Sequence, residues 1–486
     1  MNYSIIRNIL GKLMILISVF MMLPLVVSFI YQEGTIYYIS YLIPMAGLLI
    51  LGYLFNIKKA TNTKMLAREG FVIVGLSWLL MSLFGCIPFM INKEIPNFFD
   101  AFFEMASGFT TTGASIITDV TVLKHSTQIW RSFSHWIGGM GVLVFILAII
   151  PESKDGYSMH ILRAESPGPQ VGKLVSRMQV TSRILYIIYL TLTLIEFLLL
   201  WLGPDKKMGV FESLFYSLGT AGTGGFSMHA NGLEFFTPYS QYVIAIFMII
   251  FGINFSLFYL LLLGNIKEVF KNEELRWYLG IVLISVVIIC INIYSTYQNF
   301  EQSFRLSLFQ VATIISTTGF SSANFDTWPA LSKTILVTLM FLGGMAGSTA
   351  GGLKISRINI LLKSAIRKIK KMINPRKVET QTIDNKPLTD NMVESVEGYF
   401  IVYFILLILC VLLISVDNFD FTTNFTASLA CISNVGPGLN LVGPYGSYAM
   451  YSSFSKFILS LVMIIGRLEL FPILVLFSPT TWRRRL

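Results

Sequence analysis

The stretch FTASLACISNVGPGLN, from Phe425 to Asn440, begins with apolar and small residues and ends with residues that form loops. Asn434, Gly436, Pro437 and Gly438 disfavour a helix, because asparagine and glycine favour turns and proline lacks a backbone N–H. The apolar part is shorter than the roughly 20 residues that a helix needs to cross a bilayer. A membrane segment that cannot cross must turn back, so the stretch predicts a re-entrant loop.

The composition indicates that this stretch lies in a membrane protein. The chain has 486 residues, of which 54% are hydrophobic and 13% charged, and a soluble protein of this size could not bury so much apolar surface. The first two apolar windows follow one another closely without a clear cleavage site, so we expect a retained hairpin rather than a signal peptide. The apolar windows are Leu13–Phe29, Ile36–Phe55, Phe71–Ile91, Val142–Ile150, Ile184–Leu202, Tyr242–Leu263, Tyr278–Ile293, Ile335–Met345, Tyr399–Val416 and Phe457–Phe477.

The distribution of the positive charges predicts the topology. The net charge is +10, and 27 of the 36 Lys and Arg residues lie in segments that can be assigned to one side. By the positive-inside rule that side is the cytoplasm. The densest basic stretch, KSAIRKIKKMINPRK (Lys363–Lys377), suits either lipid headgroups or a cytoplasmic protein partner. The assigned segments are the N-terminus, 57–70, 153–183, 265–277, 354–391 and the C-terminal tail.

The re-entrant pattern occurs four times. Each copy has an amphipathic run too short to span, followed by small residues, Thr or Ser, and a glycine. Two strong apolar segments flank each copy, and cytoplasmic charge bounds each unit. The four copies are NFFDAFFEMASGFTTTGAS, VFESLFYSLGTAGTGGFS, SFRLSLFQVATIISTTGFSS and DFTTNFTASLACISNVGPGL.

Four such loops around one axis have the composition of a cation selectivity filter. Irregular backbone is tolerated at membrane depth only inside protein or along a water-filled path. Rings of inward-facing carbonyls can replace the hydration shell of an alkali cation, and glycine permits the backbone angles that this requires. For a single loop the rival explanation is close helix packing through small residues. The fourfold recurrence favours a filter.

The loops TTTGAS, GTGGFS, STTGFSS and SNVGPGL resemble the four filter loops of the Trk/Ktr/HKT superfamily of potassium transporters. Three longer segments resemble the family too. SHWIGGMGVLVF (Ser134–Phe145) resembles its signature on the second helix of the first repeat. FLGGMAGSTAGGLKISR (Phe341–Arg357) resembles the interrupted helix of the third repeat, and GRLELFPILVLFSPTTWR (Gly466–Arg483) the end of the fourth. The N-terminal hairpin points to the TrkH-type membrane subunit.

The resemblance implies the ion-binding residues. The family's filter glycine falls on Gly113, Gly224, Gly319 and Gly436, and the carbonyls just before it bind the ion. Some plant members with serine at the first position favour sodium, so glycine here favours potassium. The second loop has an unusual pattern, and the fourth has no threonine beside its glycine. The implied filter residues are Thr111, Thr112, Gly113, Gly222, Thr223, Gly224, Thr317, Thr318, Gly319, Asn434, Val435 and Gly436.

An interrupted apolar segment is the candidate gate. GGMAGSTAGG (343–352) has five glycines, each of which costs a helix about 1 kcal/mol relative to alanine. Family resemblance makes it an intramembrane loop below the filter that moves on opening. A phosphate-binding loop is the disfavoured rival, because Leu353 stands where the pattern requires lysine and no strand precedes it. The candidate gate residues are Gly343, Gly344, Gly347, Ser348, Thr349, Gly351, Gly352 and Arg467.

Several ionisable residues inside the apolar segments invite a function. Arg467 could hold the gate loop and repel resting cations, or could pair with Glu469. Glu104 and Glu212 precede filter loops and could attract cations or orient the short helices. Glu196 is expected to find a polar partner inside the bundle.

Other chemistries are not favoured. His135 is expected to pack at an interface rather than bind a metal. The four cysteines are expected to be packing residues, since they have no metal-like spacing. No nucleophile–base pair is visible, so enzymatic activity is not expected. The cysteines are Cys86, Cys290, Cys410 and Cys431.

The sequence therefore predicts an all-α membrane protein in which four helix–re-entrant loop–helix repeats surround a central pore. The expected units are a hairpin (1–62) and repeats 63–165, 166–272, 273–390 and 391–486. The predicted function is potassium uptake across the bacterial inner membrane, with both termini cytoplasmic. The alternatives are a sodium- or proton-coupled symporter on the same scaffold, and a membrane enzyme or structural bundle. The resemblance implies a homodimer and a separate TrkA-like subunit that binds NAD or ATP, with no nucleotide bound by this chain.

Overall fold

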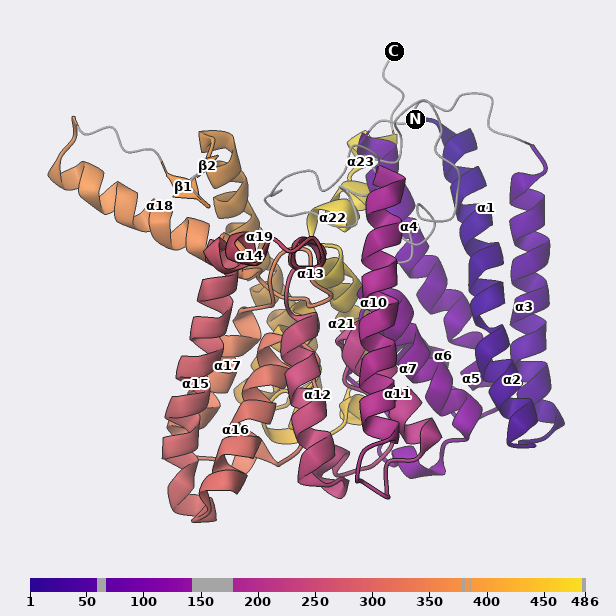
Figure 1. Ribbon diagram of the computed structural model, residues 1–486. Helices are drawn as coiled ribbons and strands as arrows, with labels where there is room; N and C mark the ends of the chain where they lie inside the picture. Colours follow the sequence, from indigo (N-terminus) through magenta and orange to yellow (C-terminus); the bar gives the residue numbers. More distant parts are fainter. Residues whose placement is uncertain (59–66, 142–177, 377–380, 385, 483–486) are drawn as a thin grey trace.

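The computed structural model describes residues 1–58, 67–141, 178–376, 381–384 and 386–482. The window Val142–Ile150 and most of the segment 153–183 lie outside the described residues, as do the predicted unit boundaries at 62/63 and 165/166. The helices stand mostly side by side between two ends of the molecule (Figure 1).

The first part of the chain forms the N-terminal helices and two of the short helices. Its helices are α1 (Tyr3–Phe20), α2 (Met22–Ile30), α3 (Thr35–Asn56), α4 (Ala67–Gly85), α5 (Ile87–Ile91), α6 (Phe98–Phe109), α7 (His125–Gly139), α10 (Met178–Trp201), α11 (Val210–Gly222), α12 (Pro238–Phe251), α13 (Phe255–Leu262) and α14 (Ile266–Lys271).

The second part contains the other two short helices and a two-stranded antiparallel hairpin that the sequence did not predict. Its elements are α15 (Glu273–Tyr297), α16 (Phe300–Ile315), α17 (Ala330–Phe341), α18 (Ile355–Ile373), β1 (Thr382–Ile383), β2 (Lys386–Pro387), α19 (Asp390–Ile414), α20 (Phe421–Ile432), α21 (Ser453–Arg467), α22 (Phe471–Phe477) and α23 (Pro479–Trp482). One-turn 3-10 helices occupy Val120–Val122, Gly232–Phe235, Phe325–Thr327, Ser415–Asp417, Asn440–Val442 and Tyr448–Met450.

Six stretches of described helix are long and apolar enough to cross a membrane, or seven if one bent pair is counted as a span. Several predicted windows are broken in the structure. Tyr242–Leu263 becomes α12 and α13, which meet at 93°. Ile335–Met345 ends with α17 at Phe341, and Phe457–Phe477 is divided between α21 and α22. Hydropathy alone could not locate these breaks.

The N-terminal helices form a tight hairpin. α1 packs along α3, and a Cβ added to Gly52 would lie 2.8 Å from the carbonyl oxygen of Gly11. Glycine at both positions therefore lets the two backbones approach closely, as small residues do in membrane helix pairs. This hairpin lies at one side of the molecule, and α15 and α18 lie at the other (Figure 1).

The four short helices α6, α11, α16 and α20 end inside the protein, because the residues of their last turns are buried. Three of them begin at a side-chain cap, which satisfies a backbone N–H that lacks a partner in the helix. Asn97 caps α6, Asn299 caps α16 and Asp420 caps α20. The caps fix where these three short helices start, whereas α11 begins after Gly209 without a side-chain cap.

Candidate functional site

The four short helices end in the same backbone motif. Just after each helix ends, a backbone N–H donates to the carbonyl five residues earlier, and the preceding N–H donates to the carbonyl three residues earlier. The residue that donates the shorter-range bond, to the carbonyl three residues earlier, has a left-handed conformation with φ near +55° in every loop. The long-range pairs are Thr112 to Ser107, Gly224 to Gly219, Thr318 to Thr313 and Val435 to Ala430, and the left-handed residues are Thr111, Thr223, Thr317 and Asn434.

This motif corrects the assignment of the second filter loop. Its hydrogen bonds make Gly224 equivalent to Thr112, Thr318 and Val435, so the equivalent of Gly113 is Gly225. A Cβ on Gly224 would run into the imidazole of His135. The predicted set Gly222, Thr223 and Gly224 is therefore one residue too early. The repeated pattern Thr-x-Gly-Phe-Ser, shared by the second and third loops, is the sequence signal that identifies Gly225.

Gly113, Gly225, Gly319 and Gly436 form a closed ring of backbone contacts. A Cβ on Gly113 would lie 2.7 Å from the nitrogen of Gly225, and one on Gly225 would lie 2.5 Å from the carbonyl carbon of Gly319. A Cβ on Gly319 would collide with the carbonyl oxygen of Val435, and one on Gly436 would lie 2.5 Å from that of Thr112. Each of these nearest neighbours is backbone, so no side-chain movement could make room.

The ring places backbone carbonyls of all four loops close together. Gly113, Gly319 and Gly436 also have positive φ, a conformation that favours glycine. With the second loop moved by one residue, the predicted filter residues converge at one place in the buried centre of the fold. Such an arrangement can offer several carbonyl oxygens to one dehydrated cation.

The glycine-rich segment 343–352 lies directly against these loops. It leaves α17 and returns to α18 through a short parallel bridge, in which the N–H of Gly343 donates to the carbonyl of Leu353 at 2.7 Å. The Thr223 hydroxyl donates to the carbonyl of Thr349 at 2.9 Å. The N–H of Gly351 donates to the Thr317 hydroxyl at 2.6 Å. The segment is thus attached to the left-handed residues of the second and third loops.

Arg467 connects this segment to the end of α7. Its guanidinium donates to the carbonyl of Thr349 and to those of Gly138 and Gly139, each at 2.7 Å. Glu469 forms its ion pair with Arg357 instead. The sequence left open whether Arg467 holds the loop or pairs with Glu469, and the geometry shows contact with the loop.

The other ionisable residues singled out from the sequence lie apart from the glycine-rich segment in the described contacts. Glu104 is fully buried and paired with Arg131. Glu212 is half-buried in the first turn of α11. Glu196 is buried near the side chain of Thr220, but its carboxylate oxygens make no hydrogen bond among the described residues, so the predicted polar partner is not found there. The Nδ1 of His135 donates to the carbonyl of Gly108 at 2.7 Å. Within the described residues, no group of His, Cys, Asp and Glu could hold a metal ion.

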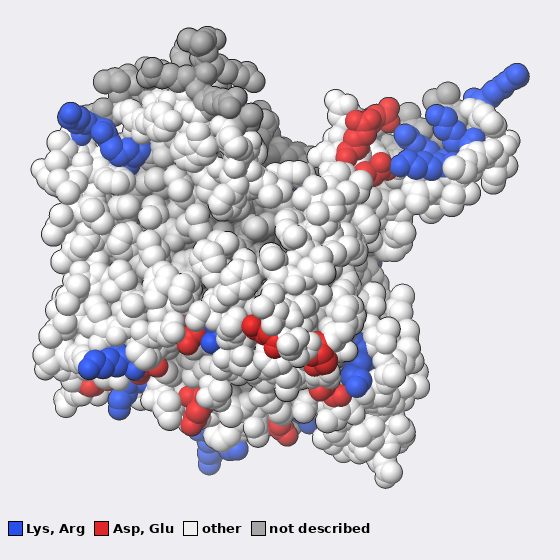
Figure 2. Space-filling model, turned by 180° about the vertical axis from the view of Figure 1, so that it is seen from behind, with Lys and Arg blue, Asp and Glu red and all other residues white. Residues whose placement is uncertain are grey.

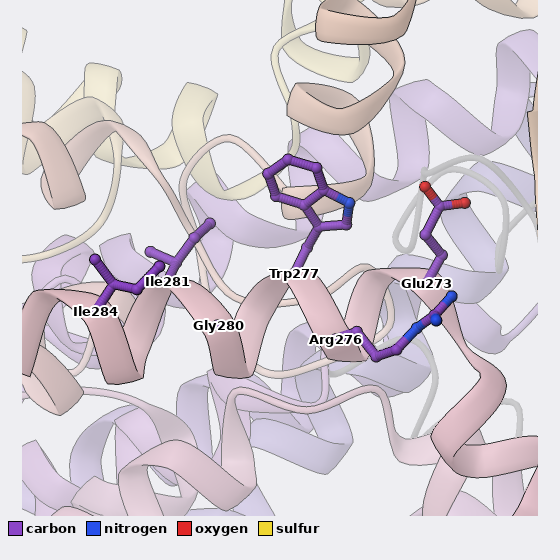
Figure 3. A pocket seen from close by; sticks show the side chains of 6 residues that line it. All are labelled: Glu273, Arg276, Trp277, Gly280, Ile281 and Ile284. Carbon is purple, nitrogen blue, oxygen red and sulfur yellow. The ribbon is translucent and has the colours of Figure 1, made fainter.

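The surface fits a membrane environment. Figure 2 shows a broad belt with few charged side chains, bounded by charged residues at both ends. A shallow groove of about 430 Å³ runs along α15 and is shown in Figure 3. It is lined by Arg276, Trp277, Ile284 and their neighbours and includes no residue of the glycine ring, so it is not part of this site.

Comparisons with known proteins agree with the geometry. The family model TrkH, described as a cation transport protein, matches residues 45–484. The "Trk system potassium uptake protein TrkH" of Salmonella typhimurium is 35% identical over 493 residues, covering 99% of this chain and all of the relative. The Escherichia coli K12 "Trk system potassium uptake protein TrkG" is 30% identical and covers 99% of each chain.

A solved structure matches the whole fold. The crystal structure of the potassium transporter TrkH from Vibrio parahaemolyticus superposes with a TM-score of 0.88 at 30% identity, covering 99% of this chain and all of that one. The expected family and all-α membrane fold are therefore confirmed, and the expectation that the chain is not an enzyme agrees with them. The chain belongs to the TrkH family of cation transport proteins.

Proposed function

We propose that this chain carries potassium into a bacterial cell through a single pore lined by four loops. The observation that supports this most is the closed ring of Gly113, Gly225, Gly319 and Gly436. The TrkH relatives are named potassium uptake proteins, and the ring gives such an activity a physical basis in this chain. Carbonyls of the two residues before each glycine would replace the water around the ion.

The segment 343–352 is proposed as the gate. It is attached to Thr223 and Thr317 by hydrogen bonds, and Arg467 adds both a third attachment and a positive charge. Glycines let such a segment take two backbone arrangements, so it can act as a two-state element. Opening would require these hydrogen bonds to break. The four units 63–165, 166–272, 273–390 and 391–486 are proposed as the repeats around the pore.

The orientation and partners are also proposals. Both termini would be cytoplasmic in the bacterial inner membrane, on the side with most of the Lys and Arg. The phrase "Trk system" in the relatives' names describes a system, which supports a separate regulatory component. We infer a homodimer that docks a TrkA-like ring binding NAD or ATP. Flux that responds to nucleotide only when such a ring is present would support this.

The deciding experiment is flux of radioactive rubidium into proteoliposomes that contain the purified chain. Flux driven by the potassium gradient alone supports a channel. Flux that needs a sodium or proton gradient supports the coupled symporter instead. Absence of rubidium flux under every gradient would remove potassium transport as the function. In either transport mode potassium is the substrate that crosses the membrane and not a resident cofactor.

A further inference from the structure

A buried ion pair lies behind the first filter loop. The Nε of Arg131, on α7, donates to Oε1 of Glu104, on α6, at 2.9 Å. The two side chains are 1% and 0% exposed. Removing one partner of a buried pair leaves an uncompensated charge, so both residues strongly constrain their surroundings. Neither residue contacts the segment 343–352 in the described contacts, so gating does not explain this pair.

Glu104 holds the backbone that follows Gly113. Its carboxylate accepts hydrogen bonds from the Ser115 hydroxyl at 3.0 and 3.1 Å and from the N–H of Ile116 at 3.0 Å. Hydrogen bonds to a charged carboxylate are among the strong ones in proteins. The chain two and three residues beyond the first ring glycine is therefore attached to its own short helix.

Arg131 extends this attachment to the second loop. Its Nη1 donates to the carbonyl of Ser227 at 3.4 Å and to Oε1 of Gln128 at 3.0 Å. Its guanidinium carbon lies 4.2 Å from the centre of the Phe226 ring, a favourable cation–π distance. Phe226 and Ser227 directly follow Gly225. One guanidinium therefore joins the segments that follow two adjacent glycines of the ring.

Two other junctions between loops use the backbone. The N–H of Leu233 donates to the carbonyl of Ser321 at 2.7 Å, which joins the second and third loops. The N–H of Tyr448 donates to the carbonyl of Ser115 at 2.9 Å, which joins the fourth and first. Among these three junctions, that of the first and second loops is made directly by a charged side chain, whereas Arg305 reaches the junction of the second and third loops only through Gln241. The spacing of the first and second loops is thus set by residues that can be substituted without changing the backbone.

We propose that Glu104 and Arg131 are positioning residues that set the distance between the first and second walls of the ion site and thereby its preference for potassium over sodium. The inference rests on the proposed function, because it assumes that the glycine ring binds the transported ion. The pair would act through Ser115, Phe226 and Ser227 rather than by touching the ion. Sodium is the smaller cation. Walls that are no longer held at the distance that suits potassium could approach sodium more closely, and the site would then discriminate against sodium less.

Arg131→Lys is the most direct test. Lysine keeps the positive charge but lacks the planar fork that reaches Glu104, Gln128 and Ser227 together. We expect the ratio of rubidium to sodium uptake in proteoliposomes to fall by about tenfold, corresponding to the loss of one charge-assisted hydrogen bond. Arg367→Lys is the matched control, because Arg367 pairs with Asp390 on the exposed part of α18 and contacts none of the four loops in the described contacts. Its uptake ratio should equal that of the unchanged chain.

A second pair of variants covers the carboxylate. Glu104→Gln keeps an acceptor but removes the charge, and should also lower the ratio. The control Glu273→Gln, in the half-buried pair with Lys363, should leave it unchanged. If either buried variant fails to reach the membrane, Phe226→Leu is tested in the same assay. This substitution removes the aromatic side chain that stacks on Arg131 and keeps both charges, and it should also lower the uptake ratio.

The outcomes separate three conclusions. A lower uptake ratio at normal protein amount and melting temperature supports the positioning role. An unchanged ratio, with only less protein or a lower melting temperature, shows that the pair serves stability and overturns the inference. An unchanged chain that shows no preference for potassium overturns the proposed function itself, and the positioning role with it.

Discussion

Replacement of Arg467 by glutamine should raise basal ion flux. In the structure its guanidinium makes one hydrogen bond to the segment 343–352, at the carbonyl of Thr349, and two to the carbonyls of Gly138 and Gly139. Glutamine is shorter and uncharged, so it cannot span the same acceptors. The substitution would therefore remove an attachment from the closed arrangement of the segment. Because this attachment belongs to the closed arrangement, its loss shifts the equilibrium toward the open one.

The size of this effect follows from the single bond to the segment. A hydrogen bond from a charged donor contributes about 1.5–3 kcal/mol, so its loss shifts the equilibrium between closed and open segment by roughly 10- to 150-fold. Thr349 keeps the hydrogen bond from Thr223, which favours the lower end of that range. We therefore expect about a tenfold rise in basal rubidium flux in proteoliposomes.

Arg467→Lys separates the charge from the attachment. Lysine retains the positive charge near the pore but has fewer directed donors, so its flux should fall between the unchanged chain and Arg467→Gln. Equal flux in all three proteins, at equal amounts in the vesicle, would refute the idea that this residue holds a closed gate. A loss of flux in Arg467→Gln, with folding intact, would refute it too.

Three further predictions concern the ring and its contact with the gate. Gly113→Ser should weaken the preference for potassium, because its Cβ would lie 2.7 Å from a backbone nitrogen; an unchanged K⁺/Na⁺ flux ratio would contradict the filter assignment. Gly225→Ala should abolish rubidium flux, and His135→Ala should not restore it, because the atoms around Gly225 are backbone. Gly224→Ala should also lose flux, but His135→Ala should partly restore it, because the added Cβ meets the His135 ring. Equal rescue of both variants by His135→Ala would argue against Gly225 as the ring residue. Thr317→Val should raise basal flux several-fold, because it removes the acceptor of the buried Gly351 N–H in the segment 343–352. Leaving such an N–H without an acceptor costs about 1–3 kcal/mol. Unaltered flux would show that this bond does not restrain the gate.

The fold could be predicted from the sequence because its signals are repeated. One loop alone is ambiguous between close packing and a filter, whereas four loops of one pattern favour a filter. The family and the all-α membrane architecture were predicted correctly. Broken helices were harder, because Asn254 caps α13 right after α12 ends, and a hydropathy window averages over such a break.

The second loop was predicted one residue out of place for an equally local reason. GTGGFS contains two adjacent glycines, and only its comparison with TTGFS in the third loop, which the prediction did not make, distinguishes them in the sequence. The structure decides through the N–H of Gly224, which donates to Gly219 as its counterparts do in the other loops. The contact of Arg467 with the segment 343–352 was expected. The pairing of Glu104 with Arg131 and the bonds of Arg467 to Gly138 and Gly139 could not be predicted, because they depend on contacts between distant parts of the chain.

The fourth loop explains why asparagine can replace threonine at the left-handed position. Asparagine tolerates this conformation better than a β-branched residue does. The side-chain nitrogen of Asn434 donates to the hydroxyl of Thr112 at 3.0 Å and to the carbonyl of Met463 at 2.9 Å, so it ties the fourth wall to the first loop and to α21. Thr223 and Thr317 instead use their hydroxyls to hold the segment 343–352. If that segment is the gate, its movement frees the hydroxyls of the second and third walls, while the link between the fourth wall and the first stays intact.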